Sequence, residues 1–301
     1  MTLKHFNQTA GPVDWPSFFL MAFCYIAFGL ATSVLASWSA VAGIVAASLA
    51  ITLHSSLQHE AIHGHILRSD WARSLSVSLA IGLFVPYERF RATHLAHHDD
   101  EQLTDPYDDP ESNFQHPEAW TERGLISRGI YNFNNTLFGR MMIGPALSLI
   151  SFYRSDLSAI WRGDKAVFRA YLLHGIGLVP VLIWIEMISP LHVGQMMLAA
   201  YLGMSVLKVR TFLEHRAHED AEGRTVIIED RGLFAFLFLN NNYHALHHQE
   251  PSLKWYELPK AYAQSREAVL AQNKDYRYGN YAEVFRKFFL KRKDPVAHPL
   301  R

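Results

Sequence analysis

The chain has 301 residues, is 50% hydrophobic, and carries a formal net charge of zero at pH 7. This balance gives no sign of nucleic acid, or of an acidic macromolecule, as the main partner. The single cysteine, Cys24, excludes a disulfide framework within one chain and any iron–sulfur site of the Cys-x-x-Cys kind. Any electrons that the protein uses must therefore come from another molecule or from a cofactor without cysteine ligands.

Four long apolar stretches contain almost no charge. The first carries none, the second only the ionisable His54, the third one acid, Glu186, and the fourth no Lys, Arg, Asp or Glu through residue 207. A helix needs about 20 mostly apolar residues to cross a membrane. We therefore predict an all-α integral membrane protein with four transmembrane helices, near residues 17–36, 38–58, 170–189 and 191–212.

Lysine and arginine are distributed unevenly around these stretches. The turns at residues 36–39 and 189–192 contain neither, whereas the long loop before the third stretch is rich in both. The positive-inside rule then places both turns outside and both termini in the cytoplasm. We expect one multi-pass membrane domain over residues 1–301, with a cytosolic helical cap formed by residues 59–169 and 213–301.

A cleavable signal peptide is an alternative interpretation of residues 1–36. Its apolar core would be about 7–15 residues long, which is shorter than the stretch found here. Ser33-Val34-Leu35-Ala36 resembles a cleavage site, but Lys4 is the only firm positive charge ahead of the apolar stretch. We favour an uncleaved transmembrane helix.

Three shorter apolar stretches, at residues 74–87, 141–153 and 232–239, fall below the length of a span. Runs of this length are more often interfacial or buried helices, and we predict them as such. If residues 74–87 crossed the membrane alone, the histidines before and after them would lie on opposite faces.

Histidine is concentrated in four short clusters that hold 11 of the 17 histidines. They are His59, His63 and His65; His94, His97 and His98; His215 and His218; and His244, His247 and His248. Spacings of three and four residues place imidazoles on one helix face. The predicted topology puts all four clusters on the cytoplasmic side, which the spacing alone does not require. We therefore predict a shared metal site rather than structural histidines.

The number of histidines indicates two metals. One zinc site normally takes four ligands, whereas the three strictly spaced sets supply eight, and His215 or His218 a ninth. Imidazole binds iron, zinc, copper and nickel alike, so the residues alone do not name the metal.

Three of the clusters resemble the histidine boxes of the integral-membrane fatty acid desaturase and hydroxylase superfamily. Its members carry one H-x(3–4)-H box and two H-x(2–3)-H-H boxes on a four-span scaffold. The boxes here are His59–His63, His94–His98 and His244–His248. The resemblance extends in order and spacing over roughly residues 15–250.

The resemblance implies a non-haem di-iron site that activates O2 and attacks an unactivated C–H bond of a lipid. It makes the box histidines the iron ligands and gives a further ligand role, between the fourth span and the third box, to His215, with His218 in reserve. The implied ligands are His59, His63, His94, His97, His98, His215, His244, His247 and His248.

The resemblance also bounds the reaction. We favour desaturation of a fatty acyl chain carried as an acyl-lipid or acyl-CoA. A carotenoid ketolase or hydroxylase, or a lipid hydroxylase, is the alternative within the superfamily. No fused cytochrome b5 motif is found, so a separate electron donor of the ferredoxin or cytochrome b5 type is implied.

Several polar residues are candidates for hydrogen bonds to the ligands. Asp105 or Asp108 would accept from a ligand imidazole, although a solvated acidic loop is the simpler interpretation. His65 follows Gly64, which would end the helix and turn His65 inward; a surface role fits equally well. A polar amide before the third box, a role open to Asn241 and its two neighbouring asparagines, is sometimes found in the superfamily.

Two other functions fit part of the pattern. His59-Glu60-Ala61-Ile62-His63 matches the H-E-x-x-H motif of zinc peptidases, with Glu60 as general base. A peptidase leaves the second and third boxes unexplained. A divalent-metal transporter would place its site near the bilayer midplane, whereas these clusters lie beyond the ends of the spans.

Overall fold

The structure is a computed structural model that describes residues 13–99 and 103–300. Its helices are α1 (Trp15–Leu30), the π-helix η1 (Ala31–Leu35), α2 (Ala36–Trp38), α3 (Ala40–Ile62), α4 (Asp70–Ser76), α5 (Tyr87–Asp99), α6 (Pro117–Glu122), α7 (Leu125–Asn134), α8 (Leu137–Trp161), α9 (Lys165–Met187), α10 (Val193–Thr211), the 3-10 helix η2 (Ala221–Arg224), α11 (Leu233–Leu237), α12 (His244–Gln249), α13 (Leu258–Gln272) and α14 (Tyr281–Phe288). The strands β1 (Ile227–Ile228) and β2 (Arg277–Tyr278) pair in parallel. The predicted all-α membrane fold is confirmed.

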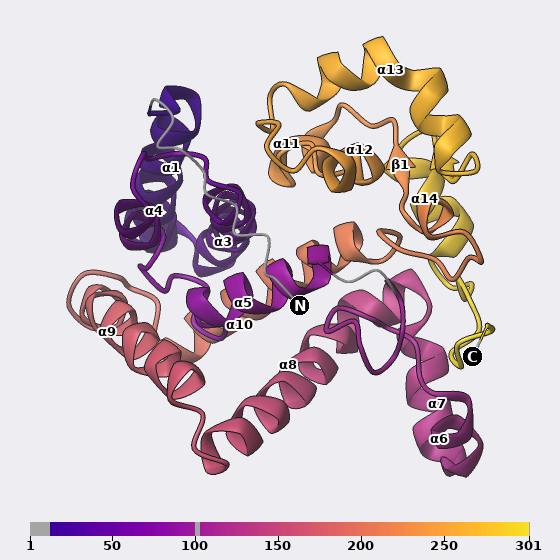
Figure 1. Cartoon of the computed structure of the whole chain (residues 1–301). Helices are drawn as coiled ribbons and strands as arrows, with labels where there is room; N and C mark the ends of the chain where they lie inside the picture. The colour runs from indigo at the N-terminus through magenta and orange to yellow at the C-terminus, as the bar shows by residue number, and fades with distance from the viewer. Residues whose placement is uncertain (1–12, 100–102, 301) are drawn as a thin grey trace.

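The N-terminal half begins with a helical hairpin of α1 and α3, drawn in indigo and purple in Figure 1. Pro16 in the first turn of α1 suits a helix start, and the Ser39 hydroxyl caps α3 by accepting from the amide of Ala42. A side chain at Gly43 would lie 2.6 Å from Cβ of Ala36, so glycine lets the chain turn tightly. Cys24 is fully buried in this hairpin, in the small apolar role expected of it.

Three helical stretches are long and apolar enough to cross a membrane: Trp15–Trp38, Ala40–Ile62 and Lys165–Met187. They match the first three predicted spans. Many of their large apolar side chains are exposed, as those of Phe19, Ile26 and Ile176 are, which is the pattern of a lipid-facing surface. α10 is 19 residues long and is not among the three. The fourth span therefore stays a prediction.

α10 packs closely along α3. A side chain at Gly203 would lie 3.0 Å from the carbonyl oxygen of Ser48, and Thr52 donates a hydrogen bond to the carbonyl of Gly203 at 3.2 Å. Met196 and Ala199 are completely buried beside them. This pairing places the end of α3, which carries the first histidine box, near the segment that follows α10.

The shorter apolar stretches have mixed outcomes. Residues 141–153 lie within α8 and residues 232–239 contain α11, as helices were expected there. The helix predicted over residues 74–87 is wrong, because α4 ends at Ser76 and the chain then runs irregularly to Pro86. There the backbone bonds to another element instead of to itself: the amide of Ala80 donates to the carbonyl of Gly177 in α9.

The C-terminal part of the described chain forms a cap beside the membrane helices, drawn in orange and yellow in Figure 1. β1, in the segment after α10, pairs with β2, which follows α13, and this pairing ties the cap to that segment. Tyr243, Tyr262 and Leu258 pack in a small apolar core under α12 and α13. This core fixes α12, which carries the third histidine box.

Candidate metal centre

Four segments bring the box histidines together. His59 lies in the last turn of α3 and His63 is its C-cap residue. α5 carries the second box and α12 the third, so the spacing of three and four residues places each set on one helix face as predicted. His215 stands beyond the end of α10, in a bridge with Thr225.

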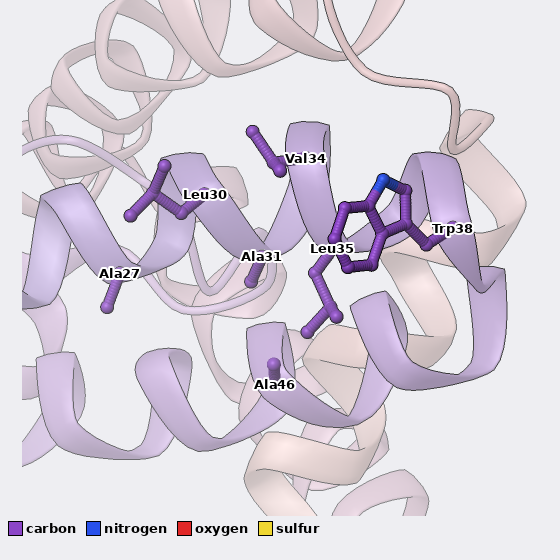
Figure 2. Close-up of a pocket in the computed structure, with 7 residues that line it drawn as sticks. All are labelled: Ala27, Leu30, Ala31, Val34, Leu35, Trp38 and Ala46. Carbon is purple, nitrogen blue, oxygen red and sulfur yellow. The ribbon is translucent and has the colours of Figure 1, made fainter.

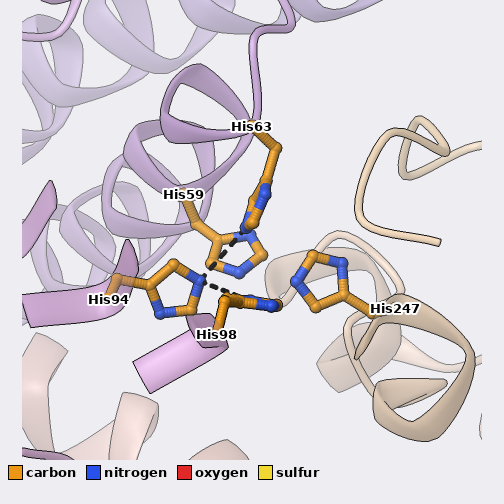
Figure 3. Close-up of side chains that lie close together, drawn as sticks. All are labelled: His59, His63, His94, His98 and His247. Carbon is orange, nitrogen blue, oxygen red and sulfur yellow. Dashed lines mark hydrogen bonds between the residues drawn. The ribbon is translucent and has the colours of Figure 1, made fainter. Parts of the chain in front are cut away.

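The imidazole nitrogens form two groups, and within each group they lie within 4.8 Å of one another. The first group is His59, His63, His94, His98 and His247, and the second is His97, His215, His244 and His248. Figure 3 shows the side chains of the first group converging from α3, α5 and α12. The rings of His98 and His248 stack with centroids 4.3 Å apart, so the two groups adjoin.

The first group has the nitrogen geometry of a metal site. Nε2 of His94 lies 3.1 Å from Nε2 of both His63 and His98. Nε2 of His59 and Nε2 of His247 are buried without a hydrogen-bond partner in the described part of the chain. Neutral imidazoles that turn their Nε2 lone pairs toward one another at this distance repel, and a cation between them removes the repulsion. The residues present therefore fit a metal ion.

The second group repeats this geometry. Nε2 of His215 lies 3.0 Å from Nε2 of His97 and 3.1 Å from Nε2 of His244. Nε2 of His248 lies 3.1 Å from that of His244. Four imidazoles around one centre match the usual ligand number of a metal bound by nitrogen.

Burial keeps most of these imidazoles neutral. It lowers the pKa of His244, His247 and His248 well below the ordinary value, and the neighbouring histidines lower it further. Burial, followed by the proximity of His94 and His97, lowers the pKa of His98 to about 3. A neutral imidazole offers the lone pair that a metal needs, so these groups are ready to bind one near neutral pH.

Two carboxylates orient the second box. Nδ1 of His97 lies 2.8 Å from Oδ1 of Asp109, and Nδ1 of His94 lies 3.1 Å from Oε1 of Glu111. A proton held on Nδ1 by a carboxylate turns Nε2 toward the metal group as a lone pair. Burial lowers the pKa of His97, but the hydrogen bond to Asp109 and the charge of Glu111 outweigh it and raise that pKa to about 9.

Asp105 and Asp108 were candidates for this role, with a solvated loop as the simpler interpretation, and they occupy other positions. Asp105 accepts hydrogen bonds from the amides of Tyr107 and Asp108 and so shapes the turn, and the side chain of Asp108 is exposed. Sequence reasoning missed Asp109 and Glu111. The sequence shows only that several acidic residues follow the second box closely. It does not show which of them contacts the imidazoles of that box.

An amide and an ion pair support the third box. Oδ1 of Asn241 lies 3.1 Å from Nδ1 of His244, the position expected for a polar amide before this box. Nδ2 of Asn241 reaches Oε1 of Glu214 at 3.5 Å, and Glu214 pairs with Arg210 at 3.0 Å. Burial raises the pKa of Glu214, and the Arg210 charge partly offsets this effect.

His65 lies inside the protein but outside both groups. Gly64 adopts a φ of 90°, which ends α3 and turns His65 inward, one of the two positions left open by the sequence. Nδ1 of His65 lies 2.7 Å from Oε2 of Glu60, and Nε2 lies 3.1 Å from the carbonyl oxygen of Ser252. The backbone amide of Trp255 also donates to Glu60. These contacts connect the first box to the cap.

The structure separates the two candidates for the extra ligand. His215 belongs to the second group, whereas His218 lies outside both groups. Nδ1 of His218 accepts from the amide of Asp220 at 3.1 Å. A side chain at position 223 would collide with the His218 ring, which shows how tightly that turn closes.

An apolar cavity of about 290 Å³, open at the surface, lies at the other end of the helical hairpin (Figure 2). Its lining is Ala27, Leu30, Ala31, Val34, Leu35, Trp38 and Ala46. Ala46 and His59 are both in α3 and 13 residues apart, which is about 20 Å along a helix. The cavity is therefore not part of the metal centre.

Comparison with known proteins agrees with this geometry. A family model described as fatty acid desaturase matches residues 36–280. The matched range contains all nine histidines of the two groups. Among curated proteins, none matches the chain.

Proposed function

Because the chain belongs to the fatty acid desaturase family, we propose that it introduces a double bond into a fatty acyl chain, in an O2-dependent reaction at two non-haem irons. Family membership makes the protein a membrane oxidoreductase of the desaturase and hydroxylase type. The observation that supports the two-metal part of the proposal is the pair of adjoining histidine groups, which together offer nine imidazoles.

The two histidine groups and the two carboxylates have separate roles in the proposed reaction. The first group would hold one iron and the second group the other, and the bound irons supply the oxidising power, drawn from O2, that cleavage of an unactivated C–H bond requires. Asp109 and Glu111 keep the ring proton of His97 and His94 on Nδ1. His97 is 0% exposed and His247 2% exposed, whereas His98, His215 and His248 are half-buried, so the centre is shielded from water on one side and reached from the other.

The substrate is a lipid acyl chain, carried as an acyl-lipid or acyl-CoA. The lipid-facing surfaces of α1, α3 and α9 favour a substrate that enters from the bilayer. The two electrons needed per turnover would come from a separate donor of the ferredoxin or cytochrome b5 type. Cys24 is the only cysteine, and its thiol donates to the carbonyl of Ala50 within the hairpin.

We also propose that α10 is a fourth membrane span and that both termini are cytoplasmic. Nε2 of His97, before α9, lies 3.0 Å from Nε2 of His215, after α10. If α9 crossed the membrane and α10 did not, these two residues would stand on opposite faces. If α10 crosses the membrane back to the cytoplasmic side, His97 and His215 lie on the same face and can be in contact. The proposal gives one membrane domain over residues 1–301 with its cap on the cytoplasmic side.

Lipid profiling of cells that express the protein tests the proposal, with the His97→Ala variant as control. New double bonds in acyl chains that disappear in the control are expected. Hydroxylated or keto products instead would move the function to a lipid hydroxylase or a carotenoid ketolase or hydroxylase. Iron analysis of the purified protein accompanies the experiment, because a missing electron donor silences the activity without affecting the metal.

A zinc peptidase is the rival function raised by the first box. Its general-base glutamate would need to face the metal-bound water. Here both oxygens of Glu60 are turned elsewhere: Oε2 bonds to His65 and Trp255, and Oε1 lies 4.0 Å from Nδ1 of His59. This arrangement favours a structural role for Glu60.

A further inference from the structure

The chain folds back onto the metal centre after α14. Residues 293–298, here named the C-terminal strap, contact two segments that border the second histidine group. One is the acidic loop, defined as residues 104–115, which contains Asp109. The other is the segment after α10, which contains His215. Both contacts join segments that are distant in the sequence, so they are tertiary contacts and not part of local helix formation.

The C-terminal strap holds the acidic loop at both ends. At its end, the amide of Gln115 donates to the carbonyl of Val296 at 2.8 Å, and the amide of His298 donates to the carbonyl of Gln115 at 2.9 Å. At its start, Nε2 of His298 lies 3.1 Å from the hydroxyl of Thr104. Thr104 and His298 are both buried, so water does not compete for this contact.

Thr104 connects the C-terminal strap to an imidazole of the second group. Its amide donates to Oδ2 of Asp109 at 2.8 Å, while Oδ1 of the same carboxylate lies 2.8 Å from Nδ1 of His97. A path of three hydrogen bonds therefore runs from His298 through Thr104 and Asp109 to His97. A loop that loosened at Thr104 would release the carboxylate that orients His97.

Lys293 reaches the second group from the other side. Its ammonium donates to the carbonyl of Phe212 at 3.1 Å and to the carbonyl of His215. Carbonyls at the end of a helix lack partners within the helix, and a cation stabilises them. The side chain of Lys293 is only 11% exposed. It therefore fixes the backbone on which His215 stands.

We propose that the C-terminal strap positions the second histidine group. Lys293 fixes the backbone of His215, and His298 fixes the orientation of His97 through the acidic loop. The inference rests on the proposed function to the extent that the groups hold metal. The first group has four of its five histidines on α3 and α5, and its remaining member, His247, on α12. Lys293 contacts Phe212 and His215, and neither belongs to the first group. The acidic loop, by contrast, also carries Glu111, which bonds to His94 of the first group. Loss of the Lys293 contact should therefore affect the two metals unequally.

The Lys293→Met variant tests the positioning role, with Lys291→Met as matched control because Lys291 is exposed two residues away. Each full-length variant is loaded anaerobically with iron(II), and bound iron per chain is measured after gel filtration. We expect Lys293→Met to retain about half of the iron that the wild type and the control retain. Lys293→Arg, which keeps a cation for the two carbonyls, should restore most of it.

Hydrogen exchange of the metal-free protein gives an independent readout for the contact between His298 and Thr104. Thr104→Val removes the hydroxyl that contacts His298 and keeps the side-chain shape. Amides of the acidic loop should exchange at least several-fold faster in this variant, while those of α3 keep their protection. If the substitution destabilised the whole fold, amides of the acidic loop and of α3 would both exchange faster.

Two results would overturn the inference. One is iron retention by Lys293→Met equal to that of Lys291→Met, with acidic-loop exchange unchanged in Thr104→Val. The other is loss of iron from both groups together with faster exchange in α3, which would mean general unfolding. A wild-type protein that bound no iron would instead contradict the proposed function, while the exchange experiment would still test the C-terminal strap.

Discussion

His97 and Asp109, twelve residues apart, meet through a hydrogen bond of 2.8 Å between Nδ1 and Oδ1 in a site where both side chains are almost fully buried. The second carboxylate oxygen accepts the amide of Thr104 at the same distance. One residue thus orients an imidazole of the second group and closes the loop from which it comes. Asp109 is therefore the carboxylate that holds His97 in place through a direct hydrogen bond.

Asp109→Asn should weaken metal binding at the second group. An amide has one acceptor oxygen, so either His97 or the amide of Thr104 would face an NH2 donor. Loss of a hydrogen-bond partner to a metal-bound histidine typically costs 10–100-fold in metal affinity or activity, and we expect a loss in that range. Asp108→Asn, at an exposed neighbouring position, is the control. Equal affinity in the two variants, measured by competition with a chelator, would contradict the role of Asp109.

His215→Ala should lose metal and activity together, whereas His218→Ala should keep both. His215 is central to the second group, with its Nε2 within 3.1 Å of the Nε2 atoms of His97 and His244. His218 only closes a local turn at Asp220. Metal content of the two purified variants checks this directly. The reverse result would mean that the segment after α10 rearranges when metal binds.

The histidine boxes were predictable because they are local. Spacings of three and four within a helix fix which imidazoles share a face, whatever the rest of the chain does. Gly64 indicated the end of α3, but whether His65 turned inward or to the surface was left open. The spans were predictable from composition, and three of the four predicted spans correspond to helices of suitable length.

The carboxylates that orient the boxes were not predictable, because their positions depend on distant contacts. Which acid of the loop meets His97 depends on how Thr104 and Gln115 are held, and residues near the C-terminus hold them. The stretch at 74–87 failed for a similar reason. Its backbone bonds to Gly177 in α9, a contact that apolar periodicity does not encode.

Asp156→Ala should destabilise the fold by roughly 3–5 kcal/mol, the usual result of removing one partner from a buried ion pair. Asp156 is 1% exposed, and its carboxylate accepts from Arg89 of α5 and from Tyr171 of α9. Thermal unfolding in detergent measures the loss. Asp70→Ala is the control, because the Asp70 side chain is 57% exposed and its ion pairs should contribute under about 1 kcal/mol. Similar effects of the two substitutions would show that the buried pair adds nothing special.

Glu60→Gln should retain iron and acyl-chain oxidation while shifting the contact with His65. Burial lowers the pKa of His65, but the charge of Glu60 outweighs this effect and raises it above its ordinary value. Removing the Glu60 charge should therefore lower the pKa of His65, which proton NMR of the labelled imidazole would follow. In a zinc peptidase the same substitution abolishes turnover by removing the general base. Loss of all activity with metal intact would revive that function.

The direction of each span can be read from cysteine labelling, because the single native cysteine is completely buried. Ser37→Cys, at the exposed turn between α1 and α3, should react with a membrane-impermeant maleimide in intact cells. Ser158→Cys and Lys291→Cys, both exposed positions, should react only after permeabilisation.

Position 291 decides the number of spans. With α10 across the membrane, it shares the cytoplasmic side with position 158, and the second metal group can assemble from α5, the His215 segment and α12. With α10 outside the membrane, position 291 would be labelled in intact cells while position 158 stayed protected. That result would separate His97 from His215 by the bilayer, although their nitrogens lie 3.0 Å apart in the structure. External labelling at position 291 would therefore contradict the fourth span and the shared site at once.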